Sequence, residues 1–461
     1  MGKDIGNIII SPNDSIKKAM KVIDDTGFRC VLIADENRHL AGILTDGDIR
    51  KHILKDINLN LSVRVIMNTR PIVLKDTYTL KEAKDVMITN SITLVPIVDQ
   101  CNVLIDYLHL PDVLSALEKN GEFHRNGKRT KAINKVLVIG GAGYIGSVLV
   151  RRLISSGFKV KVMDILLYGD ESIKELYNSK DFEFMRGDCR NMQDVICALD
   201  GVDAVVHLGE IVGDPACSLN PDFTIEVNFM ATKTLAEACS YCGINRFIFA
   251  SSCSVYGVND NELDEESELN PVSLYARCKV ESEKAILSIK DEYFNPVILR
   301  LATVYGFSYR PRFDLVINLL IAKATLDKKI KIFGGEQWRP FVSVNDVSEA
   351  VIYALNAEDK IINRKIFNVG SNDQNYQLYE IGDLIKKAIP DVYVEINKDV
   401  VDKRNYKVKF DKINKYLGFK RKKAILDEII AMKESILGAT GINIEDPKFS
   451  NYRTFIGAEA S

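Results

Sequence analysis

A tyrosine and a lysine four residues apart, Tyr275 and Lys279, carry the clearest chemical signal in the sequence. Residues at this spacing share one face of a helix, so the lysine ammonium can lie beside the phenol. A neighbouring positive charge lowers the pKa of a phenol from about 10 toward neutrality, and the phenolate can then take a proton from an alcohol. The pair follows, by 23 residues, the end of an apolar run at 246–252 that predicts a strand ending in hydroxyl residues. These residues indicate acid–base chemistry on an alcohol.

A glycine pattern at 140–146 predicts a dinucleotide site. An apolar run at 135–139 precedes it and predicts a buried strand, and a helical pattern follows directly. Gly140 permits the tight turn, Gly143 lets backbone amides approach a pyrophosphate, and Gly146 lets the helix pack closely on the strand. Strand, glycine loop and helix arrive in the order that this kind of site requires.

The strands after the glycine loop end in residues suited to a dinucleotide. The run at 159–163 leads to Asp164, 18 residues beyond Gly146, where a carboxylate accepts hydrogen bonds from both ribose hydroxyls and repels a 2′-phosphate. We therefore expect NAD rather than NADP, with a plain turn at Asp164 as the alternative. Asp188 ends a further strand and is expected beside the adenine. Alternating strands and helices predict an α/β fold with a doubly wound parallel sheet.

These motifs together resemble those of the extended short-chain dehydrogenase/reductase family, the NAD-dependent sugar-nucleotide epimerases and dehydratases. The resemblance implies a Rossmann sheet with a small C-terminal substrate-binding subdomain. It implies that Ser252 holds the reacting hydroxyl, that Tyr275 is the base, and that Lys279 orients the nicotinamide ribose and tunes the tyrosine. The positive nicotinamide ring is expected to aid the lysine in lowering the pKa of the phenol. The residues expected to contact NAD are Gly140, Gly143, Tyr144, Ile145, Gly146, Asp164, Asp188, Leu208, Gly209 and Lys279.

The resemblance extends to the substrate. Arg339 and Arg404 lie in segments that resemble those with which the family grips the diphosphate of a nucleotide sugar, and a guanidinium fork meets phosphate oxygens in pairs. Asn228 matches the family's helix asparagine and is expected to bind substrate. Arg312, together with Arg310, either serves the sugar or base end or is an ordinary loop cation. A nucleotide sugar is therefore the expected substrate.

The residues after Ser252 bear on the type of reaction. Sugar-nucleotide 4,6-dehydratases of the family carry an Asp-Glu pair there, because removing water needs an acid and a base, whereas this chain has Cys253 and Ser254. We expect a 4-epimerase that transiently oxidises a sugar hydroxyl to a ketone, and not a dehydratase. The alternatives are a dehydrogenase or 4-ketoreductase with net redox, and a non-catalytic nucleotide or redox sensor.

Glu210 departs from the family pattern, because relatives mostly have a small residue beside the cofactor at this place. Two roles are open for it. It is either a second acid/base or a salt-bridged structural carboxylate.

The front of the chain contains an internal repeat. The segment that opens at Ser15 recurs from Thr79, 64 residues later, and the apolar run at 30–35 falls on 94–99 without a gap. Each copy reads as helix, strand, turn, strand and helix. One register held over about forty residues predicts a duplicated domain.

The repeat resembles a tandem pair of CBS domains, which bind adenine nucleotides in the cleft between the copies. The resemblance assigns Thr45 and Asp48 in the first copy and Asp112 in the second to such a ligand, with His109 in place of the second threonine. A hydroxyl at a helix N-terminus suits phosphate, and a carboxylate suits paired ribose hydroxyls. The alternative is that the aspartates only cap their helices. The pair is expected either to regulate the enzyme through the nucleotide or only to assemble it.

Composition bounds the partners of the chain. Apolar residues make up 46% and charged residues 27% of the sequence, the balance of a globular protein, and the net charge of −2 gives no basic field for nucleic acid. No apolar run reaches the roughly 18 residues that span a bilayer, so no membrane partner and a cytoplasmic location are expected. Cys239 and Cys242 form a CxxC without a second pair, so no metal is expected. The family resemblance implies a homodimer or homotetramer.

The expected organisation separates the repeat from the dinucleotide motifs by a segment with Asn-Gly turns and several cations. The expected parts are the CBS pair at 1–120 with repeats at about 8–60 and 72–120, a linker at 121–133, the NAD-binding and sugar-nucleotide-binding domain at 134–438, and an unassigned tail at 439–461.

Overall fold

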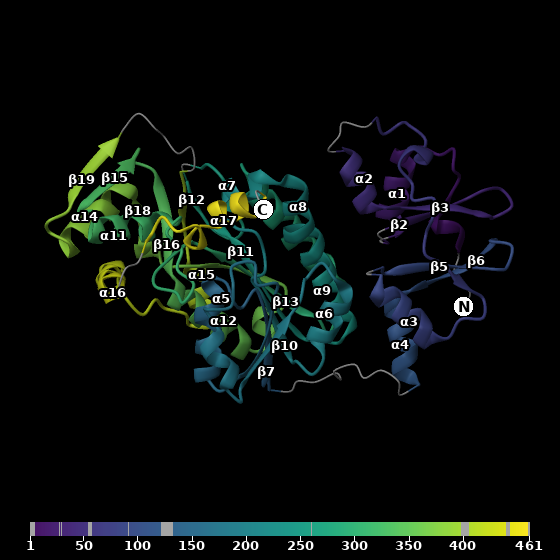
Figure 1. The fold of residues 1–461 in the computed structure, drawn as a ribbon, viewed down its shortest axis with the longest axis horizontal. Coiled ribbons are helices and arrows are strands. Elements are labelled where there is room, and N and C mark those ends of the chain that lie inside the picture. Colours follow the sequence, from purple (N-terminus) through teal and green to yellow (C-terminus); the bar gives the residue numbers. More distant parts are fainter. Residues whose placement is uncertain are drawn as a thin grey trace. The chain divides into compact units, whose positions relative to one another are not determined.

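The computed structural model describes residues 5–26, 28, 30–53, 58–90, 92–120, 132–259, 261–397, 405–438 and 443–459. The chain forms two compact units, Met1–Arg125 and Asn126–Ser461, each with its own buried core (Figure 1). Most of the expected linker at 121–133 lies outside the described residues.

The N-terminal unit consists of two copies of one motif. Each copy has a three-stranded sheet in which the first two strands are parallel and the last two antiparallel. The antiparallel register shifts at Ile33/Ala34 in the first copy and at Ile97/Val98 in the second, positions that the 64-residue repeat makes equivalent. The predicted duplication is thus visible as a shared strand order with a shared irregularity. The elements are η1 (Ile5–Ile8), β1 (Ile9–Ile10), α1 (Ile16–Thr26), β2 (Cys30–Ala34), β3 (Leu40–Thr45), α2 (Asp46–Ile53), η2 (Val63–Val65), β4 (Leu74–Lys75), α3 (Leu80–Thr89), β5 (Leu94–Val98), β6 (Leu104–His109) and α4 (Leu110–Lys119).

Alternate residues of β2 and β5 join the two copies. Every residue of β2 is buried, which explains why the strand is an unbroken apolar run. Because successive side chains point to opposite faces, Cys30 and Leu32 lie on one face of the sheet. They share a cluster with Leu94 and Val98 of β5. The two copies therefore pack through one common core.

The C-terminal unit is built on a sheet of seven parallel strands, which confirms the expected doubly wound α/β fold. The first three strands along the chain run outward to one edge, and the later strands extend from the other side of β7. The switch of direction therefore lies between β7 and β10, where α/β sheets bind ligands beyond their carboxyl ends. In spatial order the strands are β17 (Lys365–Val369), β13 (Asn295–Leu301), β11 (Arg246–Ser252), β10 (Ala204–His207), β7 (Lys135–Ile139), β8 (Lys159–Asp164) and β9 (Phe182–Arg186).

Helices cover this sheet in two groups. Helix α5 packs with α12, and α9 packs with both α6 and α10 (Figure 1). Right-handed crossovers place such groups on opposite faces of a doubly wound sheet. The helical elements between its strands are α5 (Tyr144–Ser155), η3 (Lys174–Asn178), α6 (Met192–Leu199), α7 (Asp214–Leu219), α8 (Pro221–Ile225), the π-helix η4 (Glu226–Ala231), α9 (Thr232–Tyr241), η5 (Cys253–Tyr256), α10 (Leu274–Ser288), α12 (Val344–Asn356) and α13 (Asp359–Ile362).

A smaller subdomain with a separate hydrophobic core adjoins the large sheet. Its helices α11 (Val316–Leu326), α14 (Leu378–Ala388) and α16 (Ile425–Gly438) pack against one another around that core. Segments beyond residue 438 also form structure, since α17 (Asn451–Glu459) lies against α7 and η7 (Pro447–Phe449) lies against α17. The remaining elements are β12 (Glu262–Leu263), β14 (Thr303–Tyr305), β15 (Lys329–Phe333), β16 (Trp338–Ser343), η6 (Asn372–Gln374), β18 (Asn375–Gln377), β19 (Tyr393–Asn397), β20 (Lys407–Val408) and α15 (Asp411–Leu417).

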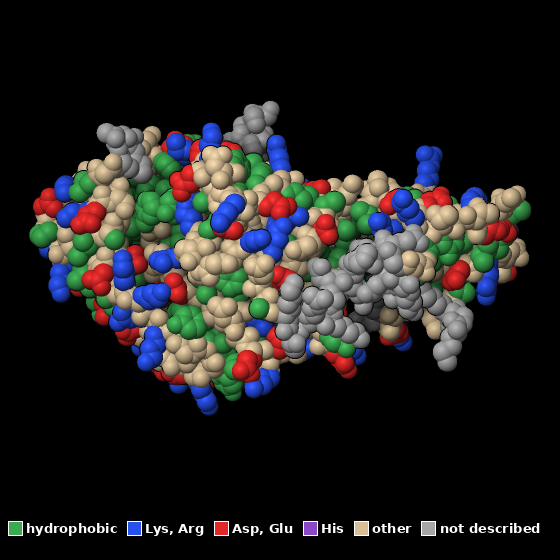
Figure 2. Space-filling view, turned by 90° about the horizontal axis from the view of Figure 1, so that it is seen from below, with side chains coloured by type: hydrophobic (Ala, Val, Ile, Leu, Met, Phe, Trp, Pro, Cys, Tyr) green, Lys and Arg blue, Asp and Glu red, His purple; other side chains and the backbone are tan. Residues whose placement is uncertain are grey.

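On the face seen in Figure 2, acidic and basic side chains are interspersed, as the near-zero net charge leads one to expect. Among the helices of the described segments, none combines the length and apolar character needed to cross a bilayer. Cys239 and Cys242 are buried thiols at the end of α9, and within the described part of the chain no three metal-ligating side chains gather.

Candidate active site

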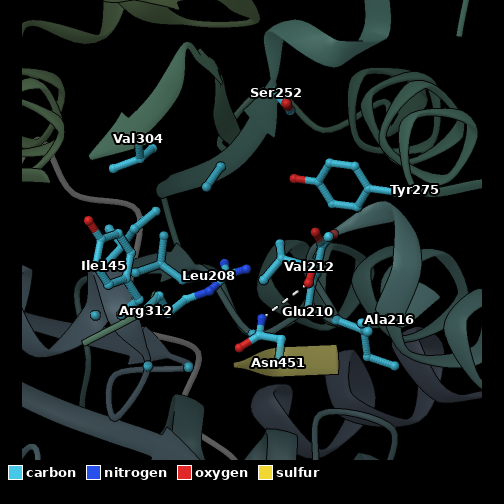
Figure 3. Close-up of a pocket in the computed structure, with 18 of the residues that line it drawn as sticks. Ile145, Leu208, Glu210, Val212, Ala216, Ser252, Tyr275, Val304, Arg312 and Asn451 are labelled. Atoms are coloured by element: carbon cyan, nitrogen blue, oxygen red, sulfur yellow. Dashed lines mark hydrogen bonds between the residues drawn. The ribbon is translucent and has the colours of Figure 1, made fainter. Parts of the chain in front are cut away.

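A cavity of about 860 Å³ lies beyond the carboxyl ends of β7, β8, β10 and β11 (Figure 3). This is the edge at which a doubly wound sheet binds its ligand. The sequence-predicted residues that the cavity brings together are Gly140, Gly143, Tyr144, Ile145, Gly146, Asp164, Asp188, Leu208, Gly209, Glu210, Ser252, Tyr275, Lys279, Arg310, Arg312 and Arg339.

The glycine loop leaves the start of α5 open to the cavity. Gly140 has a φ of +81°, and a Cβ on it would lie 2.7 Å from the Cα of Gly209. A Cβ on Gly146 would overlap the carbonyl oxygen of Gly140. Gly143 begins α5 without a side-chain cap, so the first amides of the helix can bind an anion. The loop therefore fits the pyrophosphate of a dinucleotide.

Gly146→Ala is expected to weaken NAD binding by about tenfold or more, because the methyl group would push the glycine loop away from its anion-binding shape. Calorimetric titration of the full chain with NAD measures this. Gly438→Ala is the control, since a Cβ there meets open space. Equal affinity in Gly146→Ala and the native chain would contradict the assignment of the loop.

Asp164 both supports the glycine loop and faces the cavity. Its carboxylate accepts hydrogen bonds from the amides of Ala142 at 3.0 Å and Leu166 at 2.8 Å. Burial raises the pKa of Asp164, and the two backbone donors and Arg310 offset part of that rise. A carboxylate has about four acceptor positions, so ribose hydroxyls can still donate to it. The turn expected as an alternative is present, and the carboxylate also faces the cavity.

Asp188 carries an arginine partner at the far end of the cavity. Arg190 donates to its carboxylate from Nη2 at 2.6 Å and from Nε at 3.0 Å. Burial works to raise the pKa of Asp188, but the bonds from Arg190 outweigh it and the net pKa is lowered. Asp188 is therefore ionised near neutral pH.

Helix α10 places Tyr275 and Lys279 side by side, as their spacing predicts. The ammonium of Lys279 lies 5.6 Å from the centre of the Tyr275 ring and 4.6 Å from that of Phe249. The Tyr275 phenol and Ser252, which ends β11, both line the cavity. Figure 3 shows the phenol directed into the cavity from α10. The site thus brings a hydroxyl, a phenol and a cation to one wall.

The protein groups around Tyr275 raise the pKa of its phenol, whereas the sequence-based expectation of a lowered pKa includes the positive nicotinamide ring. Burial raises the pKa of the phenol well above its ordinary value, Glu210 and Cys217 raise it further, and Ser252 lowers it only in part. Protein groups alone therefore keep Tyr275 protonated.

Glu210 forms a buried ion pair with Lys279, with 2% and 4% of the two side chains exposed. The hydroxyl of Thr232 donates to the Glu210 carboxylate at 3.5 Å and also contacts Nε2 of His207 at 2.8 Å. Of the two roles open from the sequence, the structure has the salt-bridged carboxylate.

A buried polar network fixes the end of β11. Ser251 donates to Glu283, and Arg300 binds the same carboxylate at 2.7 Å from Nη2 and 3.0 Å from Nε. Arg300 also donates to the Tyr256 hydroxyl at 3.0 Å, which in turn donates to Asn368. The network joins α10, β11, β13 and β17. Because Ser251 belongs to this network, the position of the next residue, Ser252, at the end of β11 is fixed as well.

The opposite side of the cavity carries arginines. Arg312 donates to Asp314 from Nε at 2.9 Å and from Nη2 at 2.8 Å. Arg310 stacks on the ring of Tyr168 at 3.8 Å and donates to Asn451 at 2.6 Å.

The remaining substrate arginines lie at β16 and in the segment before β20. Arg339 donates to the carbonyl of Trp338 at 2.8 Å, and its guanidinium lies 5.6 Å from the ring of Tyr406. Arg404 lies outside the described residues, but Tyr406, two residues on, lines the cavity. Arg310, Arg312 and Arg339 thus supply the described cations of this wall.

Asn228 is not brought into the cavity lining, contrary to its expected contact with substrate. Its side-chain amide is buried and bonds the backbone of Ile211 in both directions, accepting from N and donating to O at 2.8 Å each. These bonds satisfy the backbone of the loop that follows Glu210. Asn228 therefore positions that loop.

Asn451 is a cavity residue that sequence reasoning missed. It begins α17, is 1% exposed, and donates to the carbonyl of Val212 at 3.1 Å (Figure 3). Its side-chain oxygen accepts the bond from Arg310, and its backbone amide donates to Asp314. The segment from Ser450 to Tyr452 lines the cavity, but it carries no sequence motif from which this could be predicted.

In the N-terminal unit, Thr45 and Asp48 bind each other. The Thr45 hydroxyl donates to the Asp48 carboxylate at 2.6 Å, and the Asp48 amide donates back to that hydroxyl at 3.1 Å. This is the helix-capping arrangement left open by the sequence. In the second copy, His109 packs edge-on against Phe28 with ring centres 5.0 Å apart, and Asp112 lies in the first turn of α4.

Comparisons with known proteins match each of the two units to a protein family. The family model for the NAD dependent epimerase/dehydratase family matches residues 136–370, and the CBS domain model matches residues 3–55 and 63–119. A putative UDP-glucose 4-epimerase of Methanocaldococcus jannaschii is 33% identical over 260 residues, which are 55% of this chain and 82% of the relative. The dTDP-glucose 4,6-dehydratase of Escherichia coli is 29% identical over 365 residues, covering 70% of this chain and 98% of the relative.

Among solved structures, the UDP-glucuronic acid 4-epimerase from Bacillus cereus in complex with UDP-glucuronic acid and NAD matches with a TM-score of 0.59 and 28% identity. The match covers 66% of this chain and 99% of that one. Relatives at this level of identity thus include both epimerases and dehydratases. The family model spans half of the chain, and one cavity of the structure holds the glycine loop, the phenol and the lysine. The chain therefore belongs to the NAD-dependent epimerase/dehydratase family of nucleotide-sugar enzymes and carries an N-terminal pair of CBS domains.

Proposed function

We propose that this chain is an NAD-dependent nucleotide-sugar 4-epimerase that oxidises the C4 hydroxyl transiently. One observation supports this most strongly: the cavity holds Ser252, Tyr275 and Lys279 between an anion-binding glycine loop and a wall of arginines. An alcohol joined to a diphosphate fits between these two ends. NAD would therefore bind at the glycine loop, and the diphosphate of the sugar would bind at the arginines.

NAD would be held by the glycine loop at its pyrophosphate, by Asp164 at the adenosine ribose and by Lys279 at the nicotinamide ribose. When bound, it would accept a hydride, that is a proton with two electrons, from the alcohol carbon and later return it. Ser252 holds the alcohol oxygen, and Tyr275 takes its proton. Because protein groups alone keep Tyr275 protonated, the phenolate that accepts this proton would form only beside the positive nicotinamide ring, with the Lys279 ammonium next to it.

The residues after Ser252 support epimerisation over dehydration. Cys253 is 1% exposed and donates from Sγ to the carbonyl of Arg300 at 3.4 Å, and burial raises its thiol pKa far above the ordinary value. Ser254 lines the cavity, but a serine hydroxyl does not exchange protons near neutral pH. Neither residue supplies the acid and base that loss of water requires.

The arginine wall supports a diphosphate-linked substrate. Arg310, Arg312 and Arg339 are all largely buried, and buried guanidinium groups bind phosphate oxygens strongly because few waters compete. Arg312 already shares its charge with Asp314, so it orients rather than neutralises a substrate. We assign the diphosphate to Arg339, with Arg404 as its partner.

The reaction is tested by incubating the full chain and NAD with UDP, GDP, CDP and dTDP hexoses and following the sugar resonances by NMR. The proposal expects one hexose to convert to its 4-epimer without lasting formation of reduced cofactor. Stoichiometric reduced cofactor would instead establish a net dehydrogenase. A 4-keto-6-deoxy product would establish a dehydratase.

We further propose that the CBS pair binds an adenine nucleotide through Thr45, Asp48 and Asp112, as the family resemblance implies. Asp48→Asn keeps an acceptor for Thr45 but replaces one carboxylate oxygen by a donor, so it should weaken AMP or ATP binding by about tenfold. Calorimetry on the full chain measures this, with Asp46→Asn as the neighbouring control. Unchanged affinity in Asp48→Asn would leave the residue as a helix cap only.

A further inference from the structure

The ion pair between Glu210 and Lys279 is unexpected in a pocket that needs the lysine as a cation. Both side chains line the cavity, yet almost none of either is exposed. Lys279 donates in addition to the carbonyl of Ala250 at the end region of β11, which fixes the ammonium from a second side. Buried charges persist when they are paired, and Glu210 and Lys279 form such an ion pair. The pair is therefore a fixed part of the reaction wall.

Apart from Asp214, the ionisable groups around the pair contribute little charge. The groups that face it are Tyr275 on α10, His207 on β10, Cys217 and Asp214 on α7, and Cys189 after β9. Burial lowers the pKa of His207 to about 3 and raises the pKa values of Cys217 and Cys189 to about 12. His207, Cys217, Cys189 and the phenol are thus uncharged near neutral pH, whereas Asp214 is a second carboxylate in the cavity lining. Glu210 is consequently the group in direct contact that balances Lys279.

A nicotinamide ring changes charge between its two redox states, because the oxidised ring is positive and the reduced ring is neutral. A lysine alone in the wall would repel the oxidised ring and leave the reduced ring unaffected. A carboxylate that balances the lysine removes this repulsion. In a buried site a unit charge at several ångströms changes affinity by about tenfold or more.

We propose that Glu210 is a positioning residue that holds Lys279 and balances its charge, so that the pocket binds the oxidised nicotinamide cofactor in preference to the reduced one. The inference rests on the proposed function, since it concerns the same pocket and the same cofactor. An enzyme that oxidises a sugar only transiently must finish each turnover with oxidised cofactor. The Glu210 carboxylate favours that resting state.

The test compares the dissociation constants of NAD and NADH for the full chain, measured by calorimetry. The native chain is expected to bind NAD more tightly than NADH, and Glu210→Gln is expected to lose about tenfold or more of that preference. Glu210→Asp keeps the charge and should keep most of the preference. Glu281→Gln, an exposed carboxylate on α10, should match the native chain.

An unchanged NAD-to-NADH preference in Glu210→Gln would overturn the inference, as would equal losses of affinity for the two dinucleotides, which indicate a structural role alone. If Glu210→Gln does not fold, Glu210→Asp decides: a preference lost while the charge is kept would also overturn it. A native chain that binds neither dinucleotide would instead overturn the proposed function. The two failures are thereby distinguished.

The pH dependence of the preference gives a second readout that needs no variant. Burial raises the pKa of Glu210, although Lys279 lowers it in part, so the carboxylate gains its proton at a higher pH than an ordinary glutamate. Protonation removes the balancing charge, and the preference for NAD should weaken as the pH falls. The preference of Glu210→Gln should not vary with pH in that range. A native preference that stays constant down to acid pH would count against the inference.

Discussion

Tyr275→Phe is expected to lower kcat for sugar interconversion by about 10³-fold, within the range that positioned acid–base groups contribute. The substitution removes the hydroxyl that faces the cavity beside Ser252 and leaves the ring in place. NAD binding should change little, because the glycine loop and Asp164 are untouched. Initial rates and calorimetry on the same preparation measure the two effects.

Tyr393→Phe, at an exposed tyrosine of β19, is the matched control and should retain the native rate. A Tyr275→Phe protein with native activity would contradict the assignment of the base. It would favour the alternative of a chain that senses nucleotides without catalysis.

Glu283→Ala is expected to lower the free energy of unfolding of the C-terminal unit by about 3–5 kcal/mol. The substitution leaves Arg300 as an uncompensated charge, because both side chains are at most 4% exposed and Arg300 binds Glu283 through two nitrogens. Urea unfolding followed by tryptophan fluorescence measures the loss. The sequence has a single tryptophan, and Trp338 lies in β16 of this unit.

Glu281→Ala lies on the same helix at an exposed position and should change stability by no more than about 0.5 kcal/mol. Removing both charges with Glu283→Ala and Arg300→Ala together should cost less than the sum of the single changes. Strict additivity would show that the pair does not act as a unit.

The parts of the site that the sequence predicts are those set by local spacing. The glycine loop works through neighbouring backbone, and the four-residue interval places Tyr275 and Lys279 on one helix face. The parallel sheet follows from the alternation of strands and helices, which leaves few topologies. These features need no knowledge of distant contacts.

The features that escaped prediction depend on residues far apart in the chain. Glu210 pairs with Lys279 only because the segment after β10 meets α10 at the cavity, and burial of the phenol, with a smaller contribution from Glu210, raises the Tyr275 pKa. Asn228 turns toward Ile211 because that loop has backbone groups to satisfy. Asn451 reaches the cavity because α17 packs on α7. None of these contacts follows from a motif.

The central claim is that Tyr275 initiates a reversible oxidation at a sugar carbon in this cavity. The most direct test is conversion of a nucleotide sugar that carries deuterium at C4, followed by NMR. The account predicts that the 4-epimer keeps its deuterium at C4 and that no reduced cofactor accumulates. Exchange of the deuterium with solvent, or epimerisation without NAD, would contradict it.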